Sequence, residues 1–179
     1  MYCMTELVES KFEKKADGSL IEKFVKKSFI EGVKVKTLKR WFDASGDLTE
    51  IIKEGEETFI NVKQSNHTVC SHGIIKAFHY HKKQTDVWYC PIGLIQVILY
   101  DARKESKSFG QTNVFFLGER NPLVLLIPKG VAHGYRVLSE KPAHLIYFTD
   151  QAYNASDPDE IRIPFDDKKI GFDWTIKNG

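Results

Sequence analysis

From Val33 to Thr149 the sequence is a succession of short apolar segments separated by turns, with no long helical pattern between them. Each segment is rich in β-branched or aromatic residues and is bounded by glycine, proline or polar residues, which is typical of strands. The predicted strands are 33–38, 48–53, 58–64, 73–81, 86–90, 94–100, 112–117, 123–127, 131–138 and 143–149. Strands that follow one another in this way predict an all-β fold, an antiparallel sandwich or barrel, and argue against an α/β fold.

Residues 1–32 differ from the rest, and we predict that they form an N-terminal extension to a single domain over residues 33–179. Leu20, Phe24, Val25 and Phe29 recur at roughly helical spacing in a lysine-rich segment, which predicts a short helix or an irregular arm. A chain of 179 residues is long enough to bury one substantial core.

Charge and cysteine content limit the possible binding partners and the cellular location. The net charge of +2 is too small to indicate binding to nucleic acid or to an anionic membrane. Three cysteines without metal-binding spacing indicate a reducing compartment, and no apolar run approaches the length of a membrane span. The first residues have acids and lysines where a secretory signal needs an apolar stretch. We therefore predict a cytoplasmic protein.

Three histidines and an acid are the candidate functional residues. His79 and His81 are two residues apart, so in a strand both side chains face the same side, and Asp86 opens the next predicted strand. A tight turn at Pro128–Gly130 then precedes His133. These residues predict a polar site inside the barrel, which holds a metal ion, a proton-transfer base, or neither.

The spacing of these residues is similar to that of a known superfamily. Gly73-x5-His79-x-His81-x4-Asp86-x6-Gly93 resembles the first cupin motif, with aspartate where glutamate is usual, and Pro128-x-Gly130-x2-His133 resembles the core of the second. The resemblance implies a cupin double-stranded β-helix, a jelly-roll barrel with its site inside.

A narrower resemblance covers residues 33–174. Four segments resemble signature segments of the dTDP-4-dehydrorhamnose 3,5-epimerase family and follow one another in the same order. They are Gln64–Thr68, Tyr100–Gly110, Ile127–Tyr135 and Phe165–Trp174. The chain is identified as a divergent member of that family. That family inverts stereocentres beside the ketone of a nucleotide-linked 4-keto-6-deoxysugar. The resemblance implies an isomerase of deoxysugar or surface-polysaccharide biosynthesis, a nucleotide sugar as its partner, no required cofactor, and a homodimer.

The resemblance also implies residue roles. His79 corresponds to the family's catalytic histidine, and a near-neutral pKa suits such a base. Tyr147 corresponds to the catalytic tyrosine, which returns a proton from the other face of the sugar. Lys76 stands at a substrate-binding arginine, but strict alternation places it on the strand face opposite His79, so a shared pocket requires a bulge.

Further polar side chains are expected to contact the substrate. They are Gln64, Asn66, His81 and His133.

Asp86 departs from the family pattern, because it occupies the position of the lysine that stabilises the enolate. One interpretation is that Asp86 is catalytic and orients a histidine. The other is that His79, His81, Asp86 and His133 hold a divalent cation such as zinc, iron, nickel or manganese. His79 cannot be a bound ligand and a free base at once. The alternatives to an epimerase are therefore a metal-dependent cupin (a sugar isomerase or dioxygenase) and a non-catalytic sugar-binding cupin.

Ser45 is a second departure from the family pattern, because the family has a phosphate-binding arginine at this position.

Overall fold

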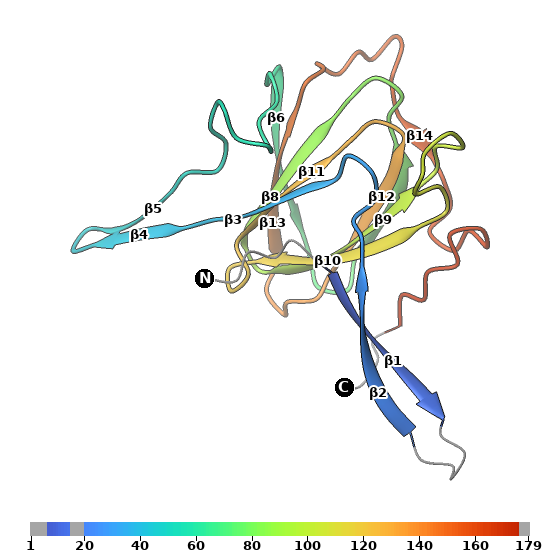
Figure 1. The fold of residues 1–179 in the computed structure, drawn as a ribbon. Coiled ribbons are helices and arrows are strands. Elements are labelled where there is room, and N and C mark those ends of the chain that lie inside the picture. Colours follow the sequence, from blue (N-terminus) through green and yellow to red (C-terminus); the bar gives the residue numbers. More distant parts are fainter. Residues whose placement is uncertain (1–6, 15–19, 176–179) are drawn as a thin grey trace.

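The computed structural model describes residues 7–14 and 20–175, and these form a β-barrel of two facing five-stranded sheets (Figure 1). The first sheet has the order β10 (Thr112–Gly118), β9 (Leu94–Asp101), β12 (Val131–Val137), β7 (Ile75–Tyr80) and β14 (Ile161–Arg162). The second has the order β3 (Lys34–Thr37), β11 (Leu123–Ile127), β8 (Asp86–Ile92), β13 (Ala143–Thr149) and β6 (Gln64–Cys70). The predicted all-β double-sheet barrel is confirmed.

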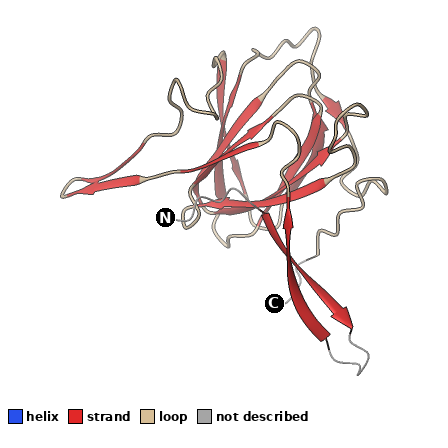
Figure 2. Ribbon diagram, in the orientation of Figure 1, coloured by secondary structure: helices blue, strands red, loops and turns tan. Residues whose placement is uncertain are grey.

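Two hairpins complete the architecture. They are β1 (Leu7–Lys14) with β2 (Leu20–Lys27), and β4 (Arg40–Asp43) with β5 (Gly46–Thr49), and both extend from the barrel (Figure 2). Every regular element in the described part of the chain is a strand, so that part contains no helix able to cross a membrane.

The barrel core is apolar, and β11 shows how it is built. Leu123, Leu125 and Ile127 pack into the main interior cluster. The intervening Val124 and Leu126 pack into a second cluster on the other side of the sheet. A strand that is apolar on every residue is therefore buried on both faces, as its composition predicts. Full burial of one such side chain contributes about 1.5–3 kcal/mol, so β11 is a major source of stability.

Of the two forms predicted for the N-terminal extension, a short helix or an irregular arm, the helix is wrong for the described residues. Residues 20–27 form strand β2, which pairs with β1 along its whole length. Leu20 and Phe24 are four residues apart, which satisfies the period of a strand as well as that of a helix, so the pattern did not discriminate. The chain then enters the barrel, where Ile30 is 1% exposed. The division of the chain at residue 32 stays a prediction.

Two strand predictions also need correction. Residues 58–63 are a loop, and the strand begins at Gln64, because β6 pairs with β13 from Gln64 opposite Thr149 to Cys70 opposite Ala143. The predicted strand 48–53 is mostly loop, and only its first residues belong to β5, which turns back on β4 through Ala44 and Ser45.

Candidate active site

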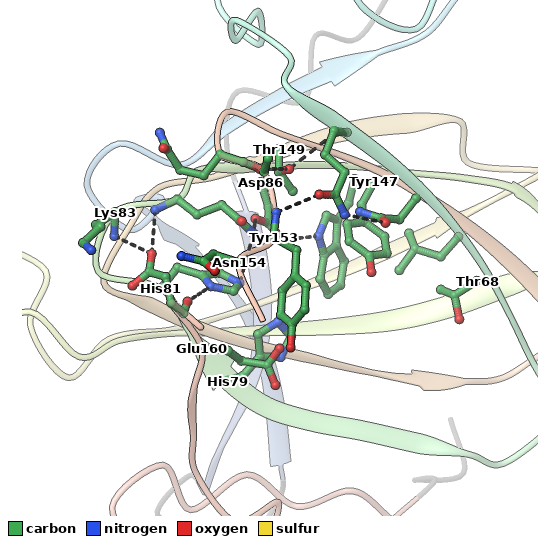
Figure 3. Close-up of a pocket in the computed structure, with 18 of the residues that line it drawn as sticks. Thr68, His79, His81, Lys83, Asp86, Tyr147, Thr149, Tyr153, Asn154 and Glu160 are labelled. Carbon is green, nitrogen blue, oxygen red and sulfur yellow. Dashed lines mark hydrogen bonds between the residues drawn. The ribbon is translucent and has the colours of Figure 1, made fainter. Parts of the chain in front are cut away.

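A cleft of about 630 Å³ opens into the barrel between the two sheets. Its wall comes from β6, β7, β8, β12 and β13, and residues 151–160 cross its mouth. The volume is in the range of small-molecule sites. Figure 3 shows the lining, with His81 and Lys83 toward one side, Tyr147 and Thr68 toward the other, and His79 beside Glu160.

The three histidines and Asp86 converge at the inner end of this cleft. His79 lies directly opposite His133 in the pairing of β7 with β12, and their Nε2 atoms are 2.9 Å apart. His133 Nε2 is 3.7 Å from Asp86 Oδ2. One nitrogen or oxygen atom from each of His79, His81, Asp86 and His133 lies within 4.8 Å of the others. The structure thus brings together all four residues that the spacing singled out.

Backbone carbonyls fix the tautomers of two histidines. His133 Nδ1 lies 2.9 Å from the carbonyl oxygen of Val131, and His81 Nδ1 contacts the carbonyl oxygen of Asp159. A carbonyl oxygen only accepts hydrogen bonds, so both Nδ1 atoms carry the proton. With the Nδ1 proton in place, the neutral form of each ring has a lone pair on its Nε2 atom, which for His133 faces His79.

Burial keeps the imidazole rings of His79 and His133 uncharged. Burial lowers the pKa of His79 to about 3, and the neighbouring His133 and His81 reinforce the shift. Burial likewise lowers the pKa of His133 to about 3. Both imidazoles are therefore neutral at neutral pH and can accept a proton or bind a cation.

Asp86 is a buried carboxylate, 2% exposed, and is held by two donors. Gln84 Nε2 donates to Oδ1 at 2.7 Å, and Trp88 Nε1 donates to Oδ2 at 3.1 Å. Among the described residues these are its hydrogen-bond donors, and neither His79 nor His81 is one of them. Gln84 Nε2 also lies 3.2 Å from His81 Nε2, so one amide group bridges His81 and Asp86. No sequence pattern pointed to Gln84.

A register shift resolves the position of Lys76. His133 pairs with His79 and Tyr135 pairs with Lys76, so three residue steps on β7 match two on β12. The resulting irregularity places Lys76 and His79 in the same cleft, as the bulge hypothesis requires. Lys76 Nζ donates to Thr68 Oγ1 at 3.2 Å.

Tyr147 lies on β13, opposite Trp88 of β8, and lines the same cleft. Burial raises the pKa of the phenol, and the negative charges of Asp86 and Glu160 raise it further. The hydroxyl of Tyr147 therefore stays protonated at neutral pH and is available as a proton donor.

Gln64 and Asn66 are joined to each other and to the mouth of the cleft. Gln64 Nε2 donates to Asn66 Oδ1 at 2.9 Å, while Gln64 Oε1 accepts from the backbone N–H of Tyr153 at 2.7 Å. Tyr153 and Glu160 also line the cleft but carry no motif of their own. Their segment is tied down by Asp159, whose carboxylate accepts from the backbone N–H groups of residues 82–84.

Two further histidines, and the serine at the second departure from the family, lie outside the cleft. His67 and His144 form an exposed pair on the edge of the second sheet, with His67 Nε2 3.0 Å from His144 Nδ1. Ser45 is exposed at the β4–β5 turn and is not part of the cleft lining.

A double-sheet β-barrel with histidines and a buried carboxylate gathered between its sheets has the architecture of the cupin class. A profile of the dTDP-4-dehydrorhamnose 3,5-epimerase family matches residues 27–178. This chain belongs to that family, whose members are isomerases.

Two relatives and one solved structure illustrate the similarity. The chain is 52% identical over 148 residues to the spore coat polysaccharide biosynthesis protein SpsL of Bacillus subtilis (strain 168), covering 83% of this chain and 98% of SpsL. It is 35% identical over 150 residues to the probable low-salt glycan biosynthesis epimerase Agl13 of Haloferax volcanii, covering 83% and 96%. The Bacillus anthracis dTDP-4-dehydrorhamnose 3,5-epimerase, solved with TDP and PPi bound, superposes with a TM-score of 0.72 at 25% identity, covering 82% and 86%.

Proposed function

We propose that this chain inverts stereochemistry beside the ketone of a nucleotide-linked 4-keto-6-deoxysugar, in deoxysugar or surface-polysaccharide biosynthesis. The observation that carries the proposal is that His79 and Tyr147 line one cleft from different sheets of the barrel. Family membership supports the reaction class. The Bacillus anthracis relative with TDP bound supports a nucleotide-linked substrate.

In this mechanism His79 removes the proton beside the ketone, and Tyr147 supplies one from the opposite face of the sugar. The imidazole of His79 is neutral and free to take up a proton, although burial lowers its pKa to about 3 and makes it a weaker base than a near-neutral histidine. The phenol of Tyr147, whose pKa is raised, keeps the proton that it would donate. Asp86 is proposed to act on His79 through His133, because Asp86 lies beside His133 and His133 in turn contacts His79. Its proposed role is therefore to orient the base and not to transfer the proton itself.

Polar residues of the cleft wall are proposed to bind the substrate. Lys76 and Lys83 offer positive charge to a diphosphate, as single point charges without the bidentate geometry of arginine. Gln64, Asn66 and His81 offer neutral hydrogen-bonding groups. His133 is only 2% exposed, and its Nε2 atom contacts Nε2 of His79. Its proposed contribution to substrate binding therefore passes through His79.

A homodimer and a cytoplasmic location complete the proposal. Trp41, Phe42 and Leu48 are 52%, 74% and 65% exposed on the β4–β5 hairpin, a concentration of apolar surface that suits a partner chain. Cys70 and Cys90 are free thiols, which suits a reducing compartment.

The testing experiment is solvent exchange. The protein is incubated in deuterium oxide with a panel of 4-keto-6-deoxysugar nucleotides, and incorporation next to the ketone is followed by mass spectrometry. Uptake on at least one nucleotide is expected. Binding without uptake across the whole panel would replace the epimerase with a sugar-binding protein.

The second candidate is a metal-dependent sugar isomerase or dioxygenase, favoured by the four donor atoms of His79, His81, Asp86 and His133. Oxygen consumption during turnover would identify a dioxygenase, since epimerisation uses no oxygen. Interconversion of a ketose and an aldose without inversion would identify the isomerase.

A further inference from the structure

A hydrogen-bonded connection between β7 and β8 holds Gln84 at the cleft. The backbone N–H of Gln84 donates to the carboxylate of Asp159 at 3.1 Å, and the two preceding N–H groups donate to the same carboxylate at 3.0 and 2.8 Å. The N–H of Thr85 donates to Asp150 Oδ1 at 2.8 Å. Four consecutive donors bind this connection to residues 150–159, so the side chain of Gln84 starts from a well-fixed backbone.

The orientation of the Gln84 amide is determined by the two acceptors that it meets. Its Nε2 atom lies 2.7 Å from Asp86 Oδ1 and 3.2 Å from His81 Nε2. A carboxylate only accepts hydrogen bonds, and the Nδ1 proton of His81, which faces the carbonyl oxygen of Asp159, leaves Nε2 of the neutral ring as an acceptor. The reversed amide places Oε1 against both acceptors. Both N–H bonds are therefore committed, and Oε1 lies on the other side of the amide.

The amide oxygen of Gln84 is left free for a ligand. Oε1 has no hydrogen-bond partner in the described part of the chain, and it is accessible from the cleft that Gln84 lines. The hydrogen bond to the Asp86 carboxylate polarises the amide, which strengthens Oε1 as an acceptor. The cleft therefore offers an oriented, uncharged acceptor at this position.

A hydroxyl group is the complement of this acceptor. The carboxylate oxygens of Asp86 are already occupied by Gln84 and Trp88, and Asp86 is 2% exposed, so the amide oxygen is the better exposed of these groups. A neutral oxygen acceptor suits a sugar hydroxyl, which donates one O–H. Such a site selects against an analogue without the hydroxyl, because the polar group of the protein then loses its partner.

The Gln84 amide lies beside the proposed base. It contacts the ring of His81, whose centroid is 5.2 Å from that of His79. In a 4-keto-6-deoxysugar, one carbon beside the ketone carries a hydroxyl group, whereas the other carries the methyl branch. The hydroxyl-bearing carbon is therefore the neighbour of the ketone that can donate to Oε1.

We propose that Gln84 is a specificity-determining residue, whose Oε1 accepts a hydrogen bond from the hydroxyl group beside the ketone. This assignment rests on the proposed function, which supplies the sugar. It also orients the sugar, with the hydroxyl-bearing carbon toward His81 and the methyl branch toward the opposite side of the cleft, where Leu145 pairs with Thr68 (Figure 3). Sugars that lack this hydroxyl are disfavoured ligands.

Paired ligands test the assignment by calorimetry, without turnover. The probes are 6-deoxyglucose linked to whichever of dTDP, UDP, GDP and CDP binds most tightly, and the 3-deoxy analogue of the same compound. The wild-type protein is expected to bind the hydroxylated probe about tenfold more tightly. Gln84→Met keeps the length of the side chain without its amide, and it is expected to bind both probes equally. Gln96→Met is the matched control, because Gln96 pairs with Phe116 and Arg136 and does not line the cleft.

The ratio of the two affinities separates ligand recognition from structural support. A residue that only supports the fold changes both affinities together and leaves their ratio at the wild-type value. A ratio near one in the wild-type protein, or an unchanged ratio in Gln84→Met, overturns the assignment alone. A selective ratio without deuterium uptake on any nucleotide overturns the epimerase and leaves Gln84 as a binding residue. Absence of binding by every probe overturns the nucleotide-sugar function and the assignment with it.

A second variant covers the case in which Gln84→Met does not fold. Gln84→Asn keeps an amide group but draws its oxygen back by one methylene group, so the affinity ratio is expected to fall toward one. A wild-type ratio in Gln84→Asn overturns the assignment.

Discussion

His79 and His133 lie directly opposite each other on β7 and β12, with their Nε2 atoms 2.9 Å apart and a register shift immediately beyond the pair. The carbonyl of Val131 holds the proton of His133 on Nδ1, so His133 Nε2 has a lone pair to offer. The short contact between the two nitrogens then needs either a proton on His79 Nε2 or a cation between them. The chemistry of the cleft depends on which of these is present.

His79→Asn is expected to lower the rate of solvent deuterium uptake by about 10²–10⁴-fold, because an amide cannot serve as a base at neutral pH. Substrate affinity changes little, since asparagine keeps a hydrogen-bonding group in the cleft. Exchange is followed by mass spectrometry and affinity by calorimetry. His67→Asn, on the exposed edge, is the control. Wild-type exchange in His79→Asn would remove His79 from the role of base.

The central histidines were predictable because their positions follow from local rules. The period of a strand puts His79 and His81 on one side, and a glycine turn delivers His133 on the next strand of the same sheet. Gly130 has a φ of 79°, a conformation that favours glycine, so this turn is encoded in the sequence itself. The barrel was predictable for a similar reason, since the wholly apolar strand at 123–127 requires burial on both faces.

The remaining parts of the site depend on long-range pairing that no local pattern records. Lys76 reaches the cleft through the register shift between β7 and β12. Tyr153 and Glu160 reach it because Asp159 binds backbone N–H groups of residues 82–84 and β14 pairs with β7. That segment has no hydrophobic period, so its path over the barrel was not readable from the sequence.

Tyr147→Phe is expected to separate proton removal from inversion. His79 still exchanges the proton beside the ketone, but the donor on the opposite face is lost, so formation of the inverted sugar falls by about 10²–10⁴-fold. Deuterium uptake and product stereochemistry are measured on the same sample by nuclear magnetic resonance. Tyr89→Phe is the control, because Tyr89 is buried in the second core cluster. Unchanged inversion in Tyr147→Phe would assign the acid to another group.

The β4–β5 hairpin is expected to mediate assembly. A two-stranded hairpin is at best marginally stable alone in water, and Trp41 pairs with Leu48 across this one while both remain exposed. Phe42→Lys, at a residue 74% exposed, is expected to convert dimers to monomers without lowering the stability of the barrel. Light scattering after size-exclusion chromatography gives the mass. Phe109→Lys, also exposed, is the control, and a dimer that persists in Phe42→Lys would place the interface elsewhere.

Asp101 is expected to govern the acid stability of the barrel. Burial alone would raise the pKa of its carboxyl, but hydrogen bonds from Arg103, Ser106 and Ser108 outweigh burial and lower the pKa to about 2. Ser106 Oγ and Ser108 Oγ both donate to Oδ2 at 2.6 Å, and Arg103 Nε donates to Oδ1 at 2.8 Å. Arg103 Nη2 also donates to the carbonyl of Glu31, so this network joins the end of the predicted N-terminal extension to the barrel.

The sign of the effect follows from the two pKa values. The folded value is below the unfolded value of about 3.9, so the ionised carboxylate stabilises the fold above about pH 4 and loses that contribution as the pH falls toward 2. Ser108→Ala removes one donor, raises the folded pKa and moves the acid-induced loss to higher pH. Asp101→Asn lowers stability at neutral pH by about 1–3 kcal/mol and flattens the slope between pH 4 and 2. Urea unfolding at a series of pH values measures both, and an unchanged slope in Asp101→Asn would assign the acid sensitivity to other carboxylates.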